Sequence, residues 1–253
     1  MAVNRQAGIQ PVQVHPELYE LIKIGKTHSF APGSYLNIAI GPLIQTWRIG
    51  FKDAKVPAQE EITCLLEKTD PRQIELNDKE QTVFLKNKGM LIDLGALAKG
   101  YSADLIMDYL KNNNVQSALL NLGGNAVGFR KRDYWKIGIQ NPMMARDNYV
   151  SVLKVADHSV VTSGIYERQL TKEGKTYHHI LSPETGYPVT TDVASLSIYS
   201  KRSIEGEIWT TRLYGKSAKE IITELDQLEG IDGLVITKED QQMVSKGLKE
   251  KLI

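Results

Sequence analysis

Glu207 and Thr211 are the residues of this sequence whose types and spacing best suit metal chemistry. They stand four apart in EGEIWTTRLYG, residues 205–215, where the pattern predicts a helix. Both side chains would then share one helical face. A carboxylate and a hydroxyl offer the oxygen ligands that Mg²⁺ prefers, and protein-bound Mg²⁺ commonly bridges to substrate phosphates. Glu and Thr at this spacing are also common on surface helices, so the pair alone does not establish a site.

Two adjacent histidines, His178 and His179, open the segment HHILSPETGYP, residues 178–188. The segment indicates a strand followed by a tight turn, because Pro fixes φ and Gly accepts a positive φ. On a strand the two rings point to opposite faces, so at most one enters a given site. No HxH or HxxxH spacing supplies convergent metal ligands. One interpretation is a buried structural histidine beside an exposed one, and the other is a general acid or base.

Glycine-rich turns recur where predicted strands end, at Gly95, Gly123–Gly124, Gly164 and Gly186. A turn that opens a helix presents free N–H groups suited to a phosphate, although each of these turns can also be purely structural. Lys99 falls in the first turn of a predicted helix, where a cation opposes the helix dipole. A bound phosphate would resolve that conflict, and a solvated lysine is the alternative.

The elements that must position these residues are a mixture of helices and strands. Helical spacing predicts helices over 16–29, 60–68, 96–114, 205–215 and 217–228. In the helix at 96–114, Leu97, Tyr101, Leu105 and Tyr109 stand four apart, which predicts an apolar stripe facing the core. Cys64 has the spacing of a buried apolar residue in the helix at 60–68.

Short apolar and β-branched runs predict the strands. A β-hairpin is expected over 81–95 around Asn87–Gly89, with its second strand at a sheet edge. Further strands are expected within 117–129, 134–142, 149–156, 159–169, 177–183, 193–200 and 233–240. Neither a repeat nor a low-complexity linker interrupts them, so the prediction is one α+β domain spanning residues 1–253.

Composition excludes several classes of function. With 42% hydrophobic and 24% charged residues among 253, the chain has an ordinary globular composition. The 31 basic and 30 acidic residues leave a net charge of +1, which does not favour nucleic acid or an anionic membrane as partner. A single cysteine allows no disulfide within the chain. The sequence contains no apolar run of about eighteen residues and no export signal, so a cytoplasmic protein without a transmembrane segment is expected.

Several motifs, taken in order along the chain, resemble a known family. The segments IDLGALAKGYSAD, NLGGNAVGF, WKIGIQNP, VVTSGIYER and HHILSPETGYP, followed by the carboxylate-to-threonine helix, are similar to those of the FAD:protein FMN transferases. The resemblance covers nearly the whole chain. It implies a T-fold-like α+β architecture and a Mg²⁺-dependent reaction that takes FAD as substrate, attaches FMN to a threonine hydroxyl of an acceptor protein and releases AMP.

The resemblance also implies roles for individual residues. Metal ligands would be the main-chain oxygen of Ala98 and the side chains of Glu207, Thr210 and Thr211. Catalytic roles would fall to Glu207, as base for the incoming hydroxyl, and to His179, which would assist at the phosphates. The residues implied to contact FAD are Tyr35, Leu36, Asn37, Gly95, Lys99, Tyr101, His179 and Leu181.

The sequence departs from the family pattern at three places. Glu207 stands where the family usually has aspartate, and the flavin-contact segment AFDxT is replaced by YLNIA, with Asn37 for the acid and Ala39 for the threonine. The chain is also expected to lack about fifty N-terminal residues of the family, on ordinary element lengths. In many members that part carries an export signal and a lipid anchor, which would place the protein on the outer face of a membrane.

Two other functions fit the same residues. A FAD pyrophosphatase would use water as acceptor and yield FMN and AMP. A non-catalytic flavin-binding protein would keep the glycine turns and His179 without depending on magnesium. The presence of both Glu207 and Thr211 favours chemistry over binding alone, but it does not distinguish threonine from water as the acceptor.

Overall fold

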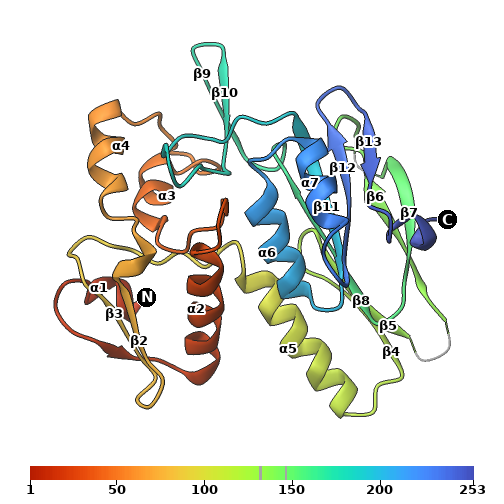
Figure 1. Ribbon diagram of the computed structural model, residues 1–253, viewed down its shortest axis with the longest axis horizontal. Coiled ribbons are helices and arrows are strands. Elements are labelled where there is room, and N and C mark those ends of the chain that lie inside the picture. The colour runs from red at the N-terminus through yellow and green to blue at the C-terminus, as the bar shows by residue number, and fades with distance from the viewer. Residues whose placement is uncertain (131–132, 146) are drawn as a thin grey trace. The chain divides into compact units, whose positions relative to one another are not determined.

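The computed structural model describes residues 1–130, 133–145 and 147–253 (Figure 1). The chain divides into two compact units, each assembled from two segments: Met1–Ala96 with Glu167–Val189, and Leu97–Tyr166 with Thr190–Ile253. Both units combine helices with small or large antiparallel sheets, so the predicted α+β class is confirmed. The single domain over 1–253 stays a prediction.

The first unit combines two small sheets with short helices. Its helical elements are α1 (Ala2–Arg5), α2 (Pro16–Ser29), α3 (Gly41–Trp47), α4 (Gln59–Leu66) and the 3₁₀ turn η1 (Pro71–Gln73). Its strands are β1 (Val12–Gln13), β2 (Ile74–Asn77), β3 (Thr82–Leu85), β9 (Gln169–Lys172) and β10 (Lys175–His178). The order β1-β3-β2 forms one sheet, and β9 with β10 forms a separate hairpin. Pro at the start of α2 and α3 suits the first helical turn, where an N–H has no intrahelical partner.

Trp47 anchors the core of the first unit to the turn after β10. Its ring is 1% exposed, and its Nε1–H donates to the main-chain oxygen of Gly186 at 2.9 Å. Gly186 has φ +72°, and a Cβ there would lie 2.5 Å from a methyl carbon of Ile62. The turn therefore requires glycine for both conformation and space. This contact fixes the segment that follows His178 and His179 onto α3 and α4.

The second unit is a six-stranded antiparallel sheet with helices. The sheet order is β13-β12-β11-β8-β5-β4, and β6 pairs with β7 in a separate hairpin. Its strands are β4 (Ser117–Asn121), β5 (Asn125–Arg130), β6 (Trp135–Gln140), β7 (Tyr149–Val155), β8 (His158–Gly164), β11 (Val193–Ser200), β12 (Ile231–Thr237) and β13 (Gln242–Val244). Its helical elements are α5 (Ala98–Asn112), α6 (Ser203–Leu213), α7 (Ala218–Leu225) and η2 (Lys249–Lys251).

Strand alternation gives the six-stranded sheet two different faces. On one face Val127 and Phe129 of β5 pack against Ala103 and Met107 of α5. Asn125 stands two residues before Val127 and is paired with Val161 of β8, so it belongs to the same face. Gly206 of α6 lies against Val161, where a Cβ would come within 2.5 Å of a methyl carbon. This face therefore carries α5 and α6, and it places Asn125 beneath them.

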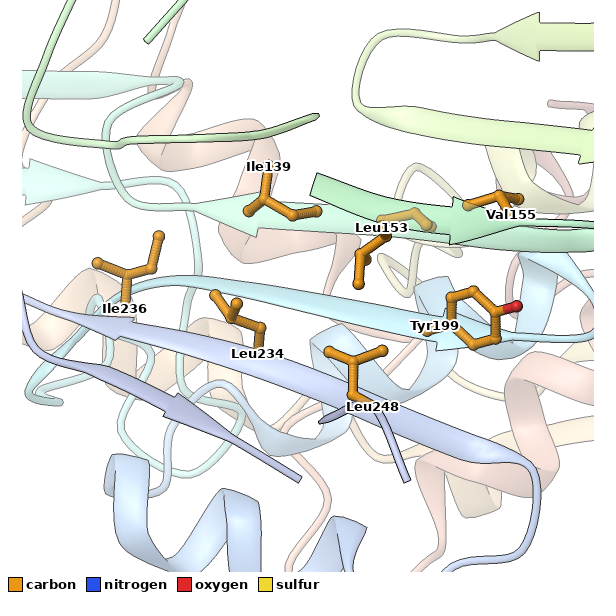
Figure 2. Packing of buried hydrophobic residues seen from close by; sticks show 8 residues of the cluster. Ile139, Leu153, Val155, Tyr199, Leu234, Ile236 and Leu248 are labelled. Atoms are coloured by element: carbon orange, nitrogen blue, oxygen red, sulfur yellow. The ribbon is translucent and has the colours of Figure 1, made fainter. Parts of the chain in front are cut away.

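The opposite face of the sheet packs on the β6–β7 hairpin (Figure 2). The cluster there comprises Ile139, Leu153, Val155, Val160, Tyr199, Leu234, Ile236 and Leu248. All eight residues of β11 are buried, because this strand is covered on both sides. Its three serines, Ser195, Ser197 and Ser200, are buried together with its apolar residues.

Tyr199 in this cluster should make the protein sensitive to alkali. Burial, helped by the charge of Asp232, raises the pKa of Tyr199 from 10.0 to about 12. The unfolded chain therefore loses this proton at a lower pH than the folded chain, so stability is intact below pH 10 and falls as the pH rises towards 12. We expect this residue to contribute about 2 to 3 kcal/mol to that loss. Denaturant unfolding from pH 9 to 12 should be flatter for Tyr199→Phe than for the unchanged protein. Equal slopes would contradict the prediction, and Tyr149→Phe, at an exposed ring, is the matched control.

The predicted hairpin around Asn87–Gly89 is wrong. Gly89 has the expected positive φ of +87°, but β3 pairs with β2 and β1 instead of with the following segment. Leu91 forms only an isolated parallel bridge with Ile40. The turn at Gly89 was therefore predicted correctly. The strand that pairs with β3 is formed by residues 74–77, where the sequence pattern indicates a strand only weakly.

The apolar stripe predicted for α5 does not face the core. Leu97 is buried, but Leu105, Ile106 and Tyr109 are 36%, 40% and 67% exposed. Residues four apart rotate by about 40° at each step, so the series leaves the buried face within three turns. The buried residues of α5 are instead Gly100, Ala103, Asp104 and Met107. Small side chains let this helix approach the sheet and α6 closely.

Cys64 is also misplaced by helical spacing, since it is exposed on α4. Ile62 is the buried residue of that helix. In the part of the chain that the structure describes, no helix is both long and apolar enough to cross a membrane.

Candidate functional site

The candidate metal residues of the second unit lie on α5 and α6, two helices that cross at Gly100. Gly100 makes the crossing possible, because a Cβ there would lie 2.6 Å from the main-chain oxygen of Ser203 and 2.7 Å from Cγ of Glu207. Ala98 is the first residue of α5, two positions before Gly100. The missing side chain of Gly100 leaves the room that the second methylene of Glu207 occupies.

Glu207 is a buried carboxylate with specific partners. It is 4% exposed, and its Oε1 accepts a hydrogen bond of 2.8 Å from the Asn125 amide. Lys99 Nζ lies 3.7 Å from the same oxygen. Burial raises the pKa of Glu207, while the Lys99 ammonium, the Asn125 amide and the Gly100 N–H act in the opposite direction. A cation near this carboxylate would offset its cost of burial.

Lys99 supplies such a cation in this structure. Its Nζ donates to the main-chain oxygen of Gly123 and to Oδ1 of Asn125, both at 3.3 Å. Together with Glu207, these groups surround the ammonium with three oxygens of different chemical kinds. The conflict between a cation and the N-terminus of α5 is thus offset by protein oxygens. A phosphate contact by Lys99 stays a prediction.

The two threonines of α6 have different surroundings. Thr210 is fully buried, and its hydroxyl donates to the main-chain oxygen of Glu207 at 3.1 Å. Thr211 is half-buried and follows Glu207 by four residues on the helix. Helical geometry therefore places Thr211 on the same face as the carboxylate. The ligand roles of Thr210 and Thr211 stay predictions.

The chemistry of this donor set fits a hard cation. Nowhere in residues 1–130, 133–145 and 147–253 do three Asp, Glu, His or Cys side chains cluster as a metal site would require. A cation at Glu207 would thus depend on hydroxyl and main-chain oxygens as well as one carboxylate. Oxygen ligands with few carboxylates are the pattern for Mg²⁺ that also binds substrate phosphates. The ammonium of Lys99 shows that this place already holds positive charge.

Asp104 mirrors Glu207 on the other helix. It is 3% exposed, and its two oxygens accept hydrogen bonds from the N–H groups of Ser203 and Ile204 at 2.8 and 3.0 Å. These N–H groups open α6 and lack intrahelical partners. The Gly100 N–H that acts on Glu207 opens α5 in the same way. A carboxylate of each helix therefore accepts hydrogen bonds from N–H groups at the N-terminus of the other helix.

The candidate flavin residues near the start of the first unit have structural contacts. The Asn37 amide donates to the main-chain oxygen of Thr69 and accepts from the Ala39 N–H, both at 2.8 Å. Leu36 is buried and Tyr35 is half-buried. Both the NH₂ and the oxygen of the Asn37 amide therefore have hydrogen-bond partners within the fold. Whether these residues contact flavin stays a prediction.

Gly95 and Leu181 also belong to the first unit. Gly95 is exposed, and its N–H donates to the Asp93 carboxylate at 2.8 Å. Leu181 is buried in the cluster around Trp47. Lys99 and Tyr101 lie in the second unit.

The two histidines differ in burial, although the second is half-buried and not exposed. His178 is buried at the end of β10, where its Nε2 faces the main-chain oxygen of Val189 at 3.0 Å and its Nδ1 accepts from the Ile180 N–H at 3.4 Å. These partners assign the ring proton to Nε2. His179 follows the strand and is half-buried. His178 is therefore the structural histidine, and His179 is the remaining candidate for catalysis.

Asn125 and Asp104 are the site residues that the sequence interpretation missed. Asn125 directly follows the glycine turn Gly123–Gly124, yet it is fully buried as the first residue of β5. The signal for Asp104 is a carboxylate next to Ala103 on the small-residue face of α5. Neither signal identifies its partner, because both contacts span 80 residues or more of sequence.

Fold and site together define an α+β protein with a buried carboxylate beside a lysine ammonium at a helix crossing. The chain belongs to the ApbE family, whose model matches residues 1–235. The family prediction is thereby confirmed.

Relatives and solved structures agree with this assignment. An FAD:protein FMN transferase of Klebsiella pneumoniae is 41% identical over 238 residues, covering 94% of this chain and 74% of the relative. An enzyme of the same name from Treponema pallidum is 35% identical, covering 99% of this chain and 74% of its own. The crystal structure of the ApbE protein from Thermotoga maritima superposes with a TM-score of 0.90 at 26% identity, covering 99% and 82% of the two chains.

Proposed function

We propose that this protein is an FAD:protein FMN transferase that depends on Mg²⁺, modifies a threonine hydroxyl and releases AMP. The structural observation that carries the proposal is the buried Glu207, held by Asn125 and Lys99 where α5 crosses α6. Support also comes from relatives of that name, which match 94% or more of the chain. Magnesium, AMP release and threonine as acceptor are our proposals.

The residues that would hold Mg²⁺ are Glu207 through its carboxylate, Thr211 through its hydroxyl and Ala98 through its main-chain oxygen, with Thr210 beside them. When bound, the ion would draw negative charge from the two phosphates of FAD. Lys99 would add a second positive charge next to them. Because the Lys99 side chain is 43% exposed, a phosphate could approach its ammonium from the solvent side.

The reaction exchanges the phosphoanhydride bond of FAD for a phosphoester bond to the acceptor. The threonine oxygen of the acceptor forms a bond to the FMN phosphorus, and the bond from that phosphorus to the bridging oxygen of AMP breaks. The hydroxyl proton passes to a base, for which Glu207 is the proposed group, and AMP leaves with the bonding electron pair. His179 is proposed to act at the phosphates. Charge stabilisation and positioning would supply most of the rate enhancement.

The family resemblance implies which residues of each unit would contact FAD. In the first unit they are Tyr35, Leu36, Asn37, Gly95, His179 and Leu181, and in the second they are Lys99 and Tyr101. The acceptor would be a redox protein that carries a short motif of small residues around its threonine.

The function is tested by incubating the protein with FAD, Mg²⁺ and an acceptor fragment that contains threonine. Intact mass should show one FMN added per acceptor, and nucleotide analysis should show an equal amount of AMP. An acceptor with threonine replaced by alanine and a sample with EDTA are the controls. Release of AMP and free FMN without labelling would identify water as acceptor and a pyrophosphatase. FAD retention without AMP in every sample would leave a flavin-binding protein.

The two histidines should respond differently to the same substitution. His178→Ala leaves the buried oxygen of Val189 without its partner, so we expect a loss of about 1 to 3 kcal/mol in stability. His179→Ala should leave stability within about 0.5 kcal/mol and slow FMN transfer at saturating FAD. Thermal unfolding and transfer rates of both variants, measured side by side, check this. The reverse pattern would mean that the catalytic and structural roles were exchanged.

A further inference from the structure

Asn125 lies between the two charged residues of the candidate site. Its side chain is fully buried, and it is the first residue of β5, directly after Gly124 with φ +98°. Its Nδ2 donates to Oε1 of Glu207 at 2.8 Å and lies 3.4 Å from the Ser203 hydroxyl. Its Oδ1 accepts from Lys99 at 3.3 Å. One amide thus contacts the carboxylate, the ammonium and the start of α6.

These partners fix which way the amide faces. An ammonium can only donate hydrogen bonds, and an ionised carboxylate can only accept them. Turning the amide over would place its NH₂ against Lys99 and its oxygen against Glu207, so both contacts would become repulsive. Because the partners differ in charge, the observed orientation is the one that satisfies both. Asn125 therefore keeps Glu207 and Lys99 at fixed places relative to β5.

Backbone geometry leaves Asn125 little freedom to relax. Pairing with Val161 holds its main chain in the sheet, while α6 covers its side chain. Outer groups that hydrogen-bond a metal ligand fix the ligand's orientation, and their loss typically weakens metal binding by 10- to 100-fold. The Asn125 amide has this relation to Glu207.

We propose that Asn125 is a positioning residue that orients the Glu207 carboxylate for a divalent cation and holds Lys99 beside it. The proposal deepens the proposed function and rests on it for the identity of the cation. Asn125 itself would not contact the cation. Its effect would be on metal affinity first and on transfer only through the bound metal.

Two variants separate orientation from packing. Asn125→Leu keeps the size of the side chain and removes both polar groups, whereas Asn125→Ser avoids any clash but no longer reaches Glu207. Asn112→Leu makes the same chemical change at the exposed last residue of α5 and serves as the matched control. Circular dichroism and thermal unfolding identify which variants are folded.

Binding of Mn²⁺, measured by electron paramagnetic resonance on the full chain without FAD, is the first readout. We expect the folded Asn125 variants to bind Mn²⁺ about 10- to 100-fold more weakly than the unchanged protein and Asn112→Leu to bind normally. The second readout is FMN transfer against Mg²⁺ concentration. The Mg²⁺ needed for half-maximal rate should rise by a similar factor, with most of the maximal rate recovered at high Mg²⁺.

The outcomes distinguish this inference from the proposed function. If the unchanged protein transfers FMN and a folded Asn125 variant keeps normal Mn²⁺ affinity and Mg²⁺ dependence, the positioning role is refuted and the function stands. A lowered melting temperature with normal metal affinity would likewise reduce Asn125 to a structural residue. If the unchanged protein binds Mn²⁺ but transfers no FMN, the proposed function fails, while the Mn²⁺ comparison still tests the role of Asn125. An unchanged protein that does not bind Mn²⁺ overturns the inference.

Discussion

Glu207→Gln should reduce FMN transfer by at least about a hundredfold. Loss of a group that only supports a metal ligand costs 10- to 100-fold, and Glu207 is the proposed ligand itself. Glutamine has the same size but neither the charge for a cation nor the capacity to take a proton.

This substitution should leave the protein folded, which makes the result interpretable. Burial raises the pKa of Glu207, so the charged form is the costly one to bury. A neutral glutamine avoids that cost and retains an oxygen that can accept from Asn125. Transfer rates, Mn²⁺ binding and melting temperature should be measured together. Glu229→Gln, at an exposed position after α7, controls for the change of charge.

Glu207→Asp refines the test. It keeps the negative charge but shortens the side chain by one methylene, so the carboxylate moves away from Asn125. We expect activity between that of the glutamine variant and that of the unchanged protein. If Glu207→Gln transferred FMN at the normal rate, neither a metal ligand nor a base could be assigned to this residue.

Gly100→Ala should disrupt the site and the packing of α5 on α6. The added Cβ would meet the Ser203 oxygen at 2.6 Å, its carbon at 2.8 Å and Glu207 Cγ at 2.7 Å. Two of these atoms are backbone, so they cannot rotate away, and the helices must separate. Overpacking of this kind costs about 1 to 3 kcal/mol. Alanine regains at most about 1 kcal/mol through its helix propensity.

The clash therefore outweighs the gain in propensity, and activity should fall further than stability. Ala98 and Lys99 precede Gly100 in the same helical turn, so a displaced α5 also displaces their oxygen and ammonium. We expect a lower denaturation midpoint together with at least a tenfold loss of transfer, which corresponds to about 1.4 kcal/mol. Ser102→Ala, on the exposed side of α5, provides the comparison. A Gly100→Ala protein as stable and active as that control would show that the crossing tolerates a wider separation.

The elements that local patterns determine were predictable from the sequence. Residues 16–29 form α2 within the expected bounds, and Gly123–Gly124 separates β4 from β5 as the glycines indicated. The predictions failed where tertiary pairing decides the outcome. For example, β3 pairs with β2 and not with the segment that follows it. In α5 the buried face is formed by residues such as Gly100 and Ala103, and not by the predicted apolar stripe.

The candidate site was predictable to the same extent. That Glu207 and Thr211 share one helix was predictable from helical spacing. The contact between Asn125 and Glu207 could not be predicted, because 82 residues separate them and no sequence feature near either residue indicates the other. The family resemblance named residues from many parts of the chain, but the hydrogen-bond partners of those residues required the structure.

The exchange of carboxylates between α5 and α6 has a consequence for how the protein folds. Asp104 and the N–H groups it accepts from are about a hundred residues apart in the chain, with four strands of the sheet between them. Contacts of such long range close slowly, because the loop entropy is lost before the contacts form. During synthesis, α5 leaves the ribosome long before the helix that completes its N-terminus. A nascent chain would thus have no assembled cation position until the last third of the sequence has emerged, so metal uptake would report the completion of folding.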